Sequence, residues 1–111
     1  MPVYERLGNI SSAAVTKGKI ADILQVRGDL DEALRIRREE ELPVFERLGD
    51  AREAAVSKWW IGFLLLKRGN LQDCGEAEAL LRSALDGLRR MKLPDAERLA
   101  TYMVQNGFTV E

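Results

Sequence analysis

Apolar residues recur at the three- and four-residue spacing of α-helices along nearly the whole chain, and β-branched residues do not alternate with polar ones as they do in strands. Glycine followed by aspartate or asparagine interrupts this pattern repeatedly. Such a pair ends one helix in a left-handed turn and caps the next. The pairs are Gly8-Asn9, Gly28-Asp29, Gly49-Asp50 and Gly69-Asn70. The pattern predicts an all-α chain with a helical stub over about 2–7 and helices over about 9–27, 30–48, 50–68, 76–92 and 95–106.

The chain also contains an internal repeat with an offset of 41 residues, in which residues 2–30 match residues 43–71 at 15 of 29 positions. The opening stretch PVYERLGN, for example, returns as PVFERLGD. Such a period indicates stacked helix pairs, each of which buries its apolar face against its neighbours. Beyond residue 71 the best alignment has an offset of 46 and pairs Ala33 with Ala79. The sequence therefore predicts a longer turn near residues 72–76.

The repeat divides a single domain, 1–111, into four parts. Residues 1–8 are interpreted as the end of the second helix of a repeat, 9–48 and 49–93 as two repeats, and 94–111 as a C-terminal capping helix and tail. Pro43 removes a backbone donor inside the predicted helix 30–48, so we expect a kink at about 40–43 or a short break with Pro43 starting a new turn. The predicted core between paired helices contains Ile20, Leu24, Ile61 and Leu65.

These residues resemble the tetratricopeptide repeat family, in its longer variant of roughly 40 residues per repeat. In that family the first helix carries a small residue between two large ones, and a glycine turn, an acidic or amide residue and a further large residue follow. The matching residues are Ile20, Ala21, Leu24, Gly28, Asp29 and Leu30 in the first repeat, and Ile61, Gly62, Leu65, Gly69, Asn70 and Leu71 in the second. The small residue early in the second helix matches Ala33 and Ala79. The resemblance implies a right-handed superhelix of antiparallel helix pairs whose first helices line a concave groove. It also implies binding of peptides or partner proteins without catalysis.

By this resemblance, four groove positions differ sharply between the repeats. They are Gly18, Lys19, Asp22 and Gln25 in the first repeat, and Trp59, Trp60, Phe63 and Leu66 in the second. Exposed aromatic residues are typical interface anchors. The candidate partner-binding or oligomer-interface residues are therefore Trp59, Trp60, Phe63, Leu66, Lys19 and Asp22. The sequence leaves three alternatives for what covers the aromatic stripe of Trp59, Phe63 and Leu66. They are a second copy of the chain, a foreign peptide, or the last helix and tail with Leu99, Tyr102, Met103 and Phe108.

Composition and charge narrow the classes of function. A net charge of −1 gives no case for nucleic acid or an anionic membrane as partner, and no apolar run reaches the length of a membrane span. The start of the chain lacks the regions of a signal peptide, and a single cysteine, Cys74, makes the reducing cytoplasm the default location. Histidine, the commonest general base and metal ligand, is absent, so we expect neither an enzyme nor a cofactor.

The charged residues of the predicted helix 30–48 are interpreted as a solvated outer face. Their four-residue spacing predicts the ion pairs Asp31–Arg35, Arg35–Glu39 and Arg37–Glu41. The consecutive carboxylates at 39–41 point in different directions on a helix, so no metal site is expected there.

The sequence thus predicts a non-catalytic protein-interaction module, a scaffold or adaptor that binds a partner protein or peptide through the concave face or self-associates through it. Because both ends of the repeat array are incompletely covered, we expect a homodimer that buries at least part of the stripe from Trp59 to Phe63. A peptide-binding monomer is the rival. A purely structural assembly unit is the alternative function, and a small helical enzyme is less favoured because no nucleophile–base pair is visible.

Overall fold

The computed structural model describes the backbone of residues 3–110 and the side chains of residues 9–110. Over this range the chain is all-α and contains no strand. The elements are α1 (Val3–Val26), α2 (Leu30–Ile36), the π-helix η1 (Arg37–Glu41), α3 (Leu42–Leu48), α4 (Ala51–Arg68), the short 3-10 helix η2 (Leu71–Asp73), α5 (Cys74–Arg90) and α6 (Asp95–Gln105).

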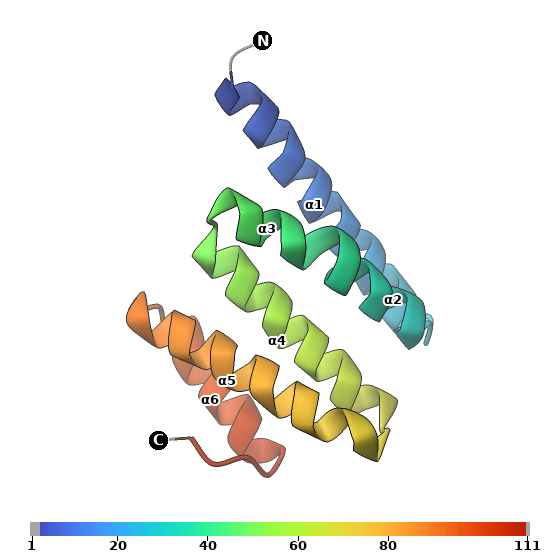
Figure 1. Ribbon diagram of the computed structural model, residues 1–111. Helices are drawn as coiled ribbons and strands as arrows, with labels where there is room; N and C mark the ends of the chain where they lie inside the picture. The colour runs from blue at the N-terminus through green and yellow to red at the C-terminus, as the bar shows by residue number, and fades with distance from the viewer. Residues whose placement is uncertain (1–2, 111) are drawn as a thin grey trace.

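Successive helices pack side by side in the order of the chain (Figure 1). The segment α2–η1–α3 runs back along α1 and lies between α1 and α4. Helix α4 packs in turn against α5, and α6 packs against α5 behind it in the view of Figure 1. The order of neighbours is therefore that of two helix pairs, α1 with α2–η1–α3 and α4 with α5, followed by one further helix.

The predicted ends of the fourth helix are confirmed by the caps of α4. The Asp50 carboxylate accepts a hydrogen bond from the Glu53 backbone N–H at 3.1 Å, which satisfies one of the free donors of the first turn. Gly49 before it and Gly69 after it have φ values of 71° and 79°, in the left-handed region that ends a helix. The turn before α5 is longer than the Gly28-Asp29 turn, as expected, but it covers residues 69–73, with η2 in it, and not 72–76, because α5 begins at Cys74.

The break predicted at Gly8-Asn9 is wrong, because α1 is continuous from Val3 to Val26. The separate stub over 2–7 is therefore not observed as an element of its own, and Pro2 lies outside the described residues. A glycine inside a helix costs only about 1 kcal/mol relative to alanine, so the signal that ends a helix at Gly49 does not force an end at Gly8.

The break considered at Pro43 does not occur, because the backbone changes its helical type there and the helical run continues. The backbone passes from α2 into a π-helix over Arg37–Glu41, and Pro43 then stands in the first turn of α3. Proline is tolerated at that place because the first N–H groups of a helix have no partner within it. Because the π turn is wider, the helical backbone continues from α2 to α3 although Pro43 has no N–H to donate.

The core confirms two of the four predicted residues. Ile61 and Leu65 are buried, with 1% and 0% of their surfaces exposed, and Leu24 is half-buried against the same cluster. The prediction for Ile20 is wrong, since 41% of its surface is exposed. Ile20 lies on a side of α1 that no other described helix covers.

The predicted match of Ala33 with Ala79 is also wrong. Ala79 is exposed, and the residue buried like Ala33 is Ala77, which packs against the first core cluster. The 3-10 turn of η2 ends before Cys74, so α5 begins two residues earlier than the helix predicted over 76–92. The side of α5 that faces α4 shifts accordingly.

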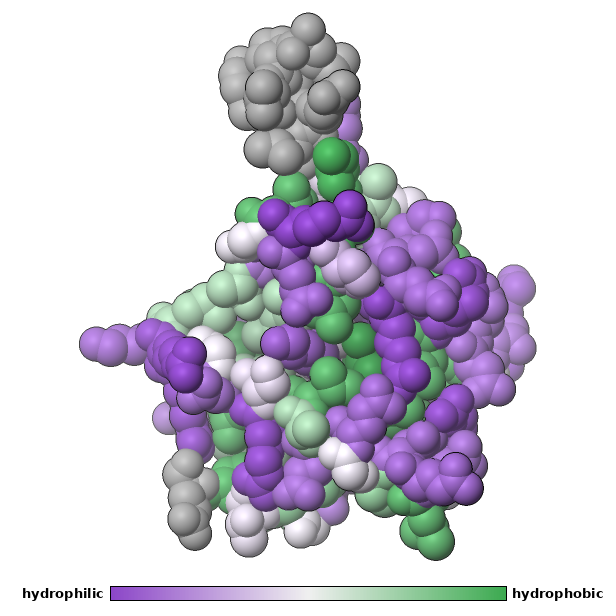
Figure 2. All heavy atoms as spheres, viewed as in Figure 1, coloured by the Kyte–Doolittle hydropathy of each residue, from purple (hydrophilic) through white to green (hydrophobic). Residues whose placement is uncertain are grey.

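Hydrophilic residues predominate on the face formed by α2, α3 and α5 (Figure 2). Arg35 forms ion pairs with Glu32 at 2.5 Å and with Glu39 at 3.3 Å, so the predicted pair Arg35–Glu39 is confirmed. The pair Asp31–Arg35 does not form, because Asp31 instead accepts from Arg68 of α4 at 2.9 Å. These residues thus form the solvated outer face that the sequence predicts. The third predicted pair, Arg37–Glu41, has a different role, described below.

The two equivalent isoleucines of the repeat test this packing. We expect Ile61→Ala to lower the free energy of unfolding by about 2–5 kcal/mol, because it empties a fully buried site. Ile20→Ala is the matched control, 41 residues earlier, and is expected to cost less than about 1 kcal/mol because the side chain is half in water. Denaturant unfolding of both variants measures the difference. Equal losses would contradict the packing described for α1.

Candidate functional site

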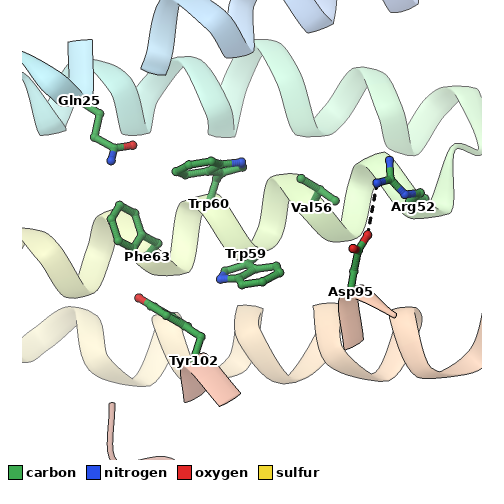
Figure 3. Close-up of a pocket in the computed structure, with 8 residues that line it drawn as sticks. All are labelled: Gln25, Arg52, Val56, Trp59, Trp60, Phe63, Asp95 and Tyr102. Atoms are coloured by element: carbon green, nitrogen blue, oxygen red, sulfur yellow. Dashed lines mark hydrogen bonds and ion pairs between the residues drawn. The ribbon is translucent and has the colours of Figure 1, made fainter. Parts of the chain in front are cut away.

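Aromatic rings gather on one side of α4 and meet a tyrosine from α6 (Figure 3). The rings of Trp60 and Phe63 meet edge to face with centroids 5.7 Å apart. Tyr102 of α6 lies 6.1 Å from Trp59 and 6.1 Å from Phe63, both in tilted arrangements. These separations fall in the range in which aromatic pairs attract each other beyond their simple burial. The cluster is therefore a packed unit built from two helices.

This aromatic cluster is only partly covered. Trp59, Trp60, Phe63 and Tyr102 are all half-buried, and they line a pocket of about 450 Å³. The remaining lining residues are Gln25, Arg52, Val56 and Asp95. Helix α6 thus covers part of the aromatic cluster through Tyr102 and leaves an apolar hollow beside it. Apolar pockets with a few polar groups at their edges are the usual form of a ligand site.

Two polar features stand at opposite ends of the pocket (Figure 3). Arg52 of α4 binds the Asp95 carboxylate at the start of α6, with 3.3 Å between Nη2 and Oδ2. At the other end, the Gln25 side-chain oxygen from α1 is buried and has no hydrogen-bond partner among the described residues. A buried acceptor without a donor is costly, but this oxygen is closed to solvent, so an incoming donor reaches it only if the Gln25 side chain turns. The polar groups of the pocket lining thus lie at its two ends.

The Tyr102 hydroxyl stays neutral near the pocket. Burial raises the pKa of the Tyr102 phenol above its ordinary value, because the phenolate would lose hydration. At neutral pH the residue is consequently an uncharged ring with a hydroxyl donor. The pocket is thus lined by neutral aromatic groups, with charge confined to the Arg52–Asp95 pair at its edge.

A buried polar network lies on the neighbouring stretch of α1, η1 and α4. Arg37 and Glu41 are 3% and 5% exposed, and they form an ion pair at 3.0 Å across the π-helix. Glu41 also accepts from the Ser57 hydroxyl at 2.8 Å, and Arg37 also binds the Asp22 carboxylate of α1. The interpretation of Arg37–Glu41 as part of a solvated face is therefore wrong. The charges are buried because η1 is covered by α1 on one side and α4 on the other.

This network supports the aromatic cluster directly. The Arg37 guanidinium lies over the Trp60 ring, with 4.6 Å from its central carbon to the ring centroid, as in a cation–π contact. Gly18 gives the network its room, since a Cβ at this position would lie 2.1 Å from a Glu41 carboxylate oxygen. The π-helix, the glycine of α1 and the position of Trp60 are therefore connected through one ion pair.

The structure distributes the predicted site residues over three environments. Trp59, Trp60 and Phe63 line the aromatic pocket, as described. Leu66 lies beside them but packs into both main core clusters, so it belongs mainly to the fold. Lys19 and Asp22 line a smaller adjacent pocket of about 170 Å³.

Some contributors to the site were not selected as site residues from the sequence. Tyr102 was expected only as a covering residue, and it also forms a wall of the pocket. In the sequence, Gln25 is only the residue that corresponds to Leu66 in the repeat. The role of Arg37 and Glu41 was concealed by the run of charges around them, because consecutive charged residues on a helix ordinarily face water.

Among the described side chains, those of residues 9–110, no group of three or more His, Cys, Asp or Glu is placed to hold a metal ion. In the same part of the chain, none of the helices combines the length and the apolar character that crossing a membrane requires. Comparisons of the chain with protein-family models, with curated proteins and with solved structures found no match in any of the three.

The buried ion pair leads to a stability prediction. Glu41→Ala removes one of the two carboxylates that the buried Arg37 guanidinium binds and leaves it the Asp22 carboxylate and the Gly18 carbonyl, so we expect a loss of about 3 kcal/mol of unfolding free energy. Glu39→Ala, two residues away on the exposed side, is the matched control and is expected to change stability by less than about 1 kcal/mol. Thermal or denaturant unfolding compares the two. Similar small effects would show that the Arg37–Glu41 pair contributes nothing specific.

Proposed function

We propose that this protein is a non-catalytic protein-interaction module of the tetratricopeptide-repeat kind, in which the aromatic pocket of α4 and α6 receives an apolar side chain from a partner peptide. The observation that carries the proposal is the half-buried cluster of Trp59, Trp60, Phe63 and Tyr102 around a hollow of about 450 Å³. Aromatic residues in such partly open pockets are the anchors that contribute most to protein association.

The internal repeat supports a role in binding for these rings. The positions of Trp59, Trp60 and Phe63 in α4 correspond to Gly18, Lys19 and Asp22 in α1, so the repeat unit itself accepts small or polar residues there. Stacking of the helix pairs instead uses other residues of α4, such as Ile61, Leu64 and Leu65, which are fully buried. Phe63 and Trp59 also pack against the first and second core clusters, but both stay half-buried, so we attribute their uncovered faces to binding.

The polar groups of the pocket define what the partner segment has to offer. The Gln25 amide lines one end of the pocket, and an amide suits a backbone or side-chain hydrogen-bonding group next to the inserted apolar group. The Arg52–Asp95 pair at the other end presents both charges within the pocket lining, so it favours a segment that is polar beyond its anchor. We therefore infer a short peptide segment with one large apolar anchor flanked by hydrogen-bonding groups.

Peptide selection tests this function. Phage-displayed peptides selected on the intact protein are expected to share a large apolar anchor, and Phe63→Asp is expected to weaken binding of a selected peptide by about 2 kcal/mol or more. Isothermal titration measures the loss. Leu71→Asp is the matched control, because Leu71 is also apolar and 89% exposed but lies in η2, outside the residues that line the pocket. Equal binding to wild type and to Phe63→Asp would contradict the proposal.

Sedimentation at micromolar concentration separates the peptide from a second copy of the chain as the occupant. With a partner peptide as the occupant, in place of the homodimer expected from the sequence, the protein should sediment as a monomer whose tryptophans remain accessible to an aqueous quencher. A wild-type dimer that Phe63→Asp converts to monomer would show instead that the pocket is the interface of a homodimer.

A further inference from the structure

One face of α4 packs against the preceding segment α2–η1–α3, and its contacts are both apolar and polar. The Ala54 methyl packs with Phe45 of α3, the Ser57 hydroxyl donates to Glu41 of η1 at 2.8 Å, and Arg68 binds Asp31 of α2 at 2.9 Å. These α4 residues lie on one side of the helix by their spacing, together with the fully buried Ile61 and Leu64. The face therefore combines an apolar centre with two polar contacts at its ends.

The corresponding face of α1 is open. At the offset of 41 residues the same positions are occupied by Ala13, Thr16, Ile20, Ile23 and Arg27. All five are exposed, and the exposed fractions of Ile20 and Ile23 are 41% and 56%, against 1% and 0% for their equivalents Ile61 and Leu64. The residue types are nearly the same in both helices: alanine, a hydroxyl residue, two large aliphatic residues and arginine.

We propose that this face of α1 binds an amphipathic helix of a partner protein, and that the helix is built like the chain's own segment α2–η1–α3. The occupant of the equivalent face on α4 defines the chemistry. It presents an apolar stripe, a carboxylate in its first turn where Asp31 binds Arg68, and a second carboxylate where Glu41 accepts from Ser57. At the equivalent positions, Arg27 in the turn after α1 matches the first carboxylate. The Thr16 hydroxyl, which donates to the Ser12 carbonyl at 3.0 Å, has to turn to reach the second.

This surface is separate from the aromatic pocket. Gln25, the one α1 residue that lines the pocket, lies on a different side of the helix from Ile20 and Ile23 by its spacing. The chain's own α2–η1–α3 segment is already held between α1 and α4, so it is not available to cover the open face. Binding of a helix at this face of α1 is consequently independent of peptide binding in the aromatic pocket.

The probe is a fluorescent peptide with the sequence of residues 29–48, titrated into the intact protein and followed by anisotropy. We expect saturable binding, and we expect Ile23→Glu to weaken it about tenfold or more, because a charge replaces an apolar contact. Val104→Glu is the matched control, since Val104 of α6 is 57% exposed, as Ile23 is 56% exposed, but lies on another helix. This control variant should bind like the wild type.

A charge exchange tests the polar contact in the same assay. The peptide variant Asp31→Arg should bind the wild-type protein more weakly, and the protein variant Arg27→Asp should restore its binding. Three results would overturn the proposal: no saturable binding, binding that Ile23→Glu leaves unchanged because the peptide displaces the chain's own segment, or a wild-type dimer in sedimentation that Ile23→Glu converts to monomer. The last result would assign the face to a second copy.

Discussion

The burial of α4 on two sides is the constraint on which the rest of this structure depends. An amphipathic helix buries one stripe, but α4 packs against α2–η1–α3 on one side and against α5 on the other. Gly62 allows α5 to approach closely, since a Cβ there would lie 2.8 Å from Leu81. With two sides used for stacking, only the third side of α4 is available for a site, and the aromatic residues lie there.

The two helix pairs use different residue types at equivalent buried positions of their second helices, apolar in one pair and charged in the other. In α5, the residues four and eight positions after the buried Ala77 are Leu81 and Leu85, which are apolar and buried. In the first pair, the residues four and eight positions after Ala33 are Arg37 and Glu41, which are equally buried but charged. A buried ion pair adds little stability compared with an apolar pair, since both charges lose hydration. The first pair therefore has less apolar packing at these positions, and in its place a buried guanidinium lies against the Trp60 ring.

This exchange connects the fold to the candidate site. Arg37 and Glu41 lie on the same side of the segment by their four-residue spacing, Gly18 leaves space for the Glu41 carboxylate, and Ser57 of α4 supplies a further donor. Short π-helical turns such as the one that holds this pair are frequent at functional sites. Here the result is a rigid floor for one tryptophan of the pocket, and rigidity in a binding site lowers the entropic cost of binding.

The sequence by itself determined the helical class, the repeat offset and the ends of α4, because helix spacing and the Gly-Asp caps are local signals. It also singled out Trp59, Trp60 and Phe63, since the repeat supplies an internal reference for what each position requires. Only the tertiary structure decided that Ile20 is exposed while Ile61 is buried, because identical residues differ according to whether a helix precedes them. The burial of Arg37 and Glu41, and the contact of Tyr102 with Trp59, were likewise decided by packing between segments distant in the chain.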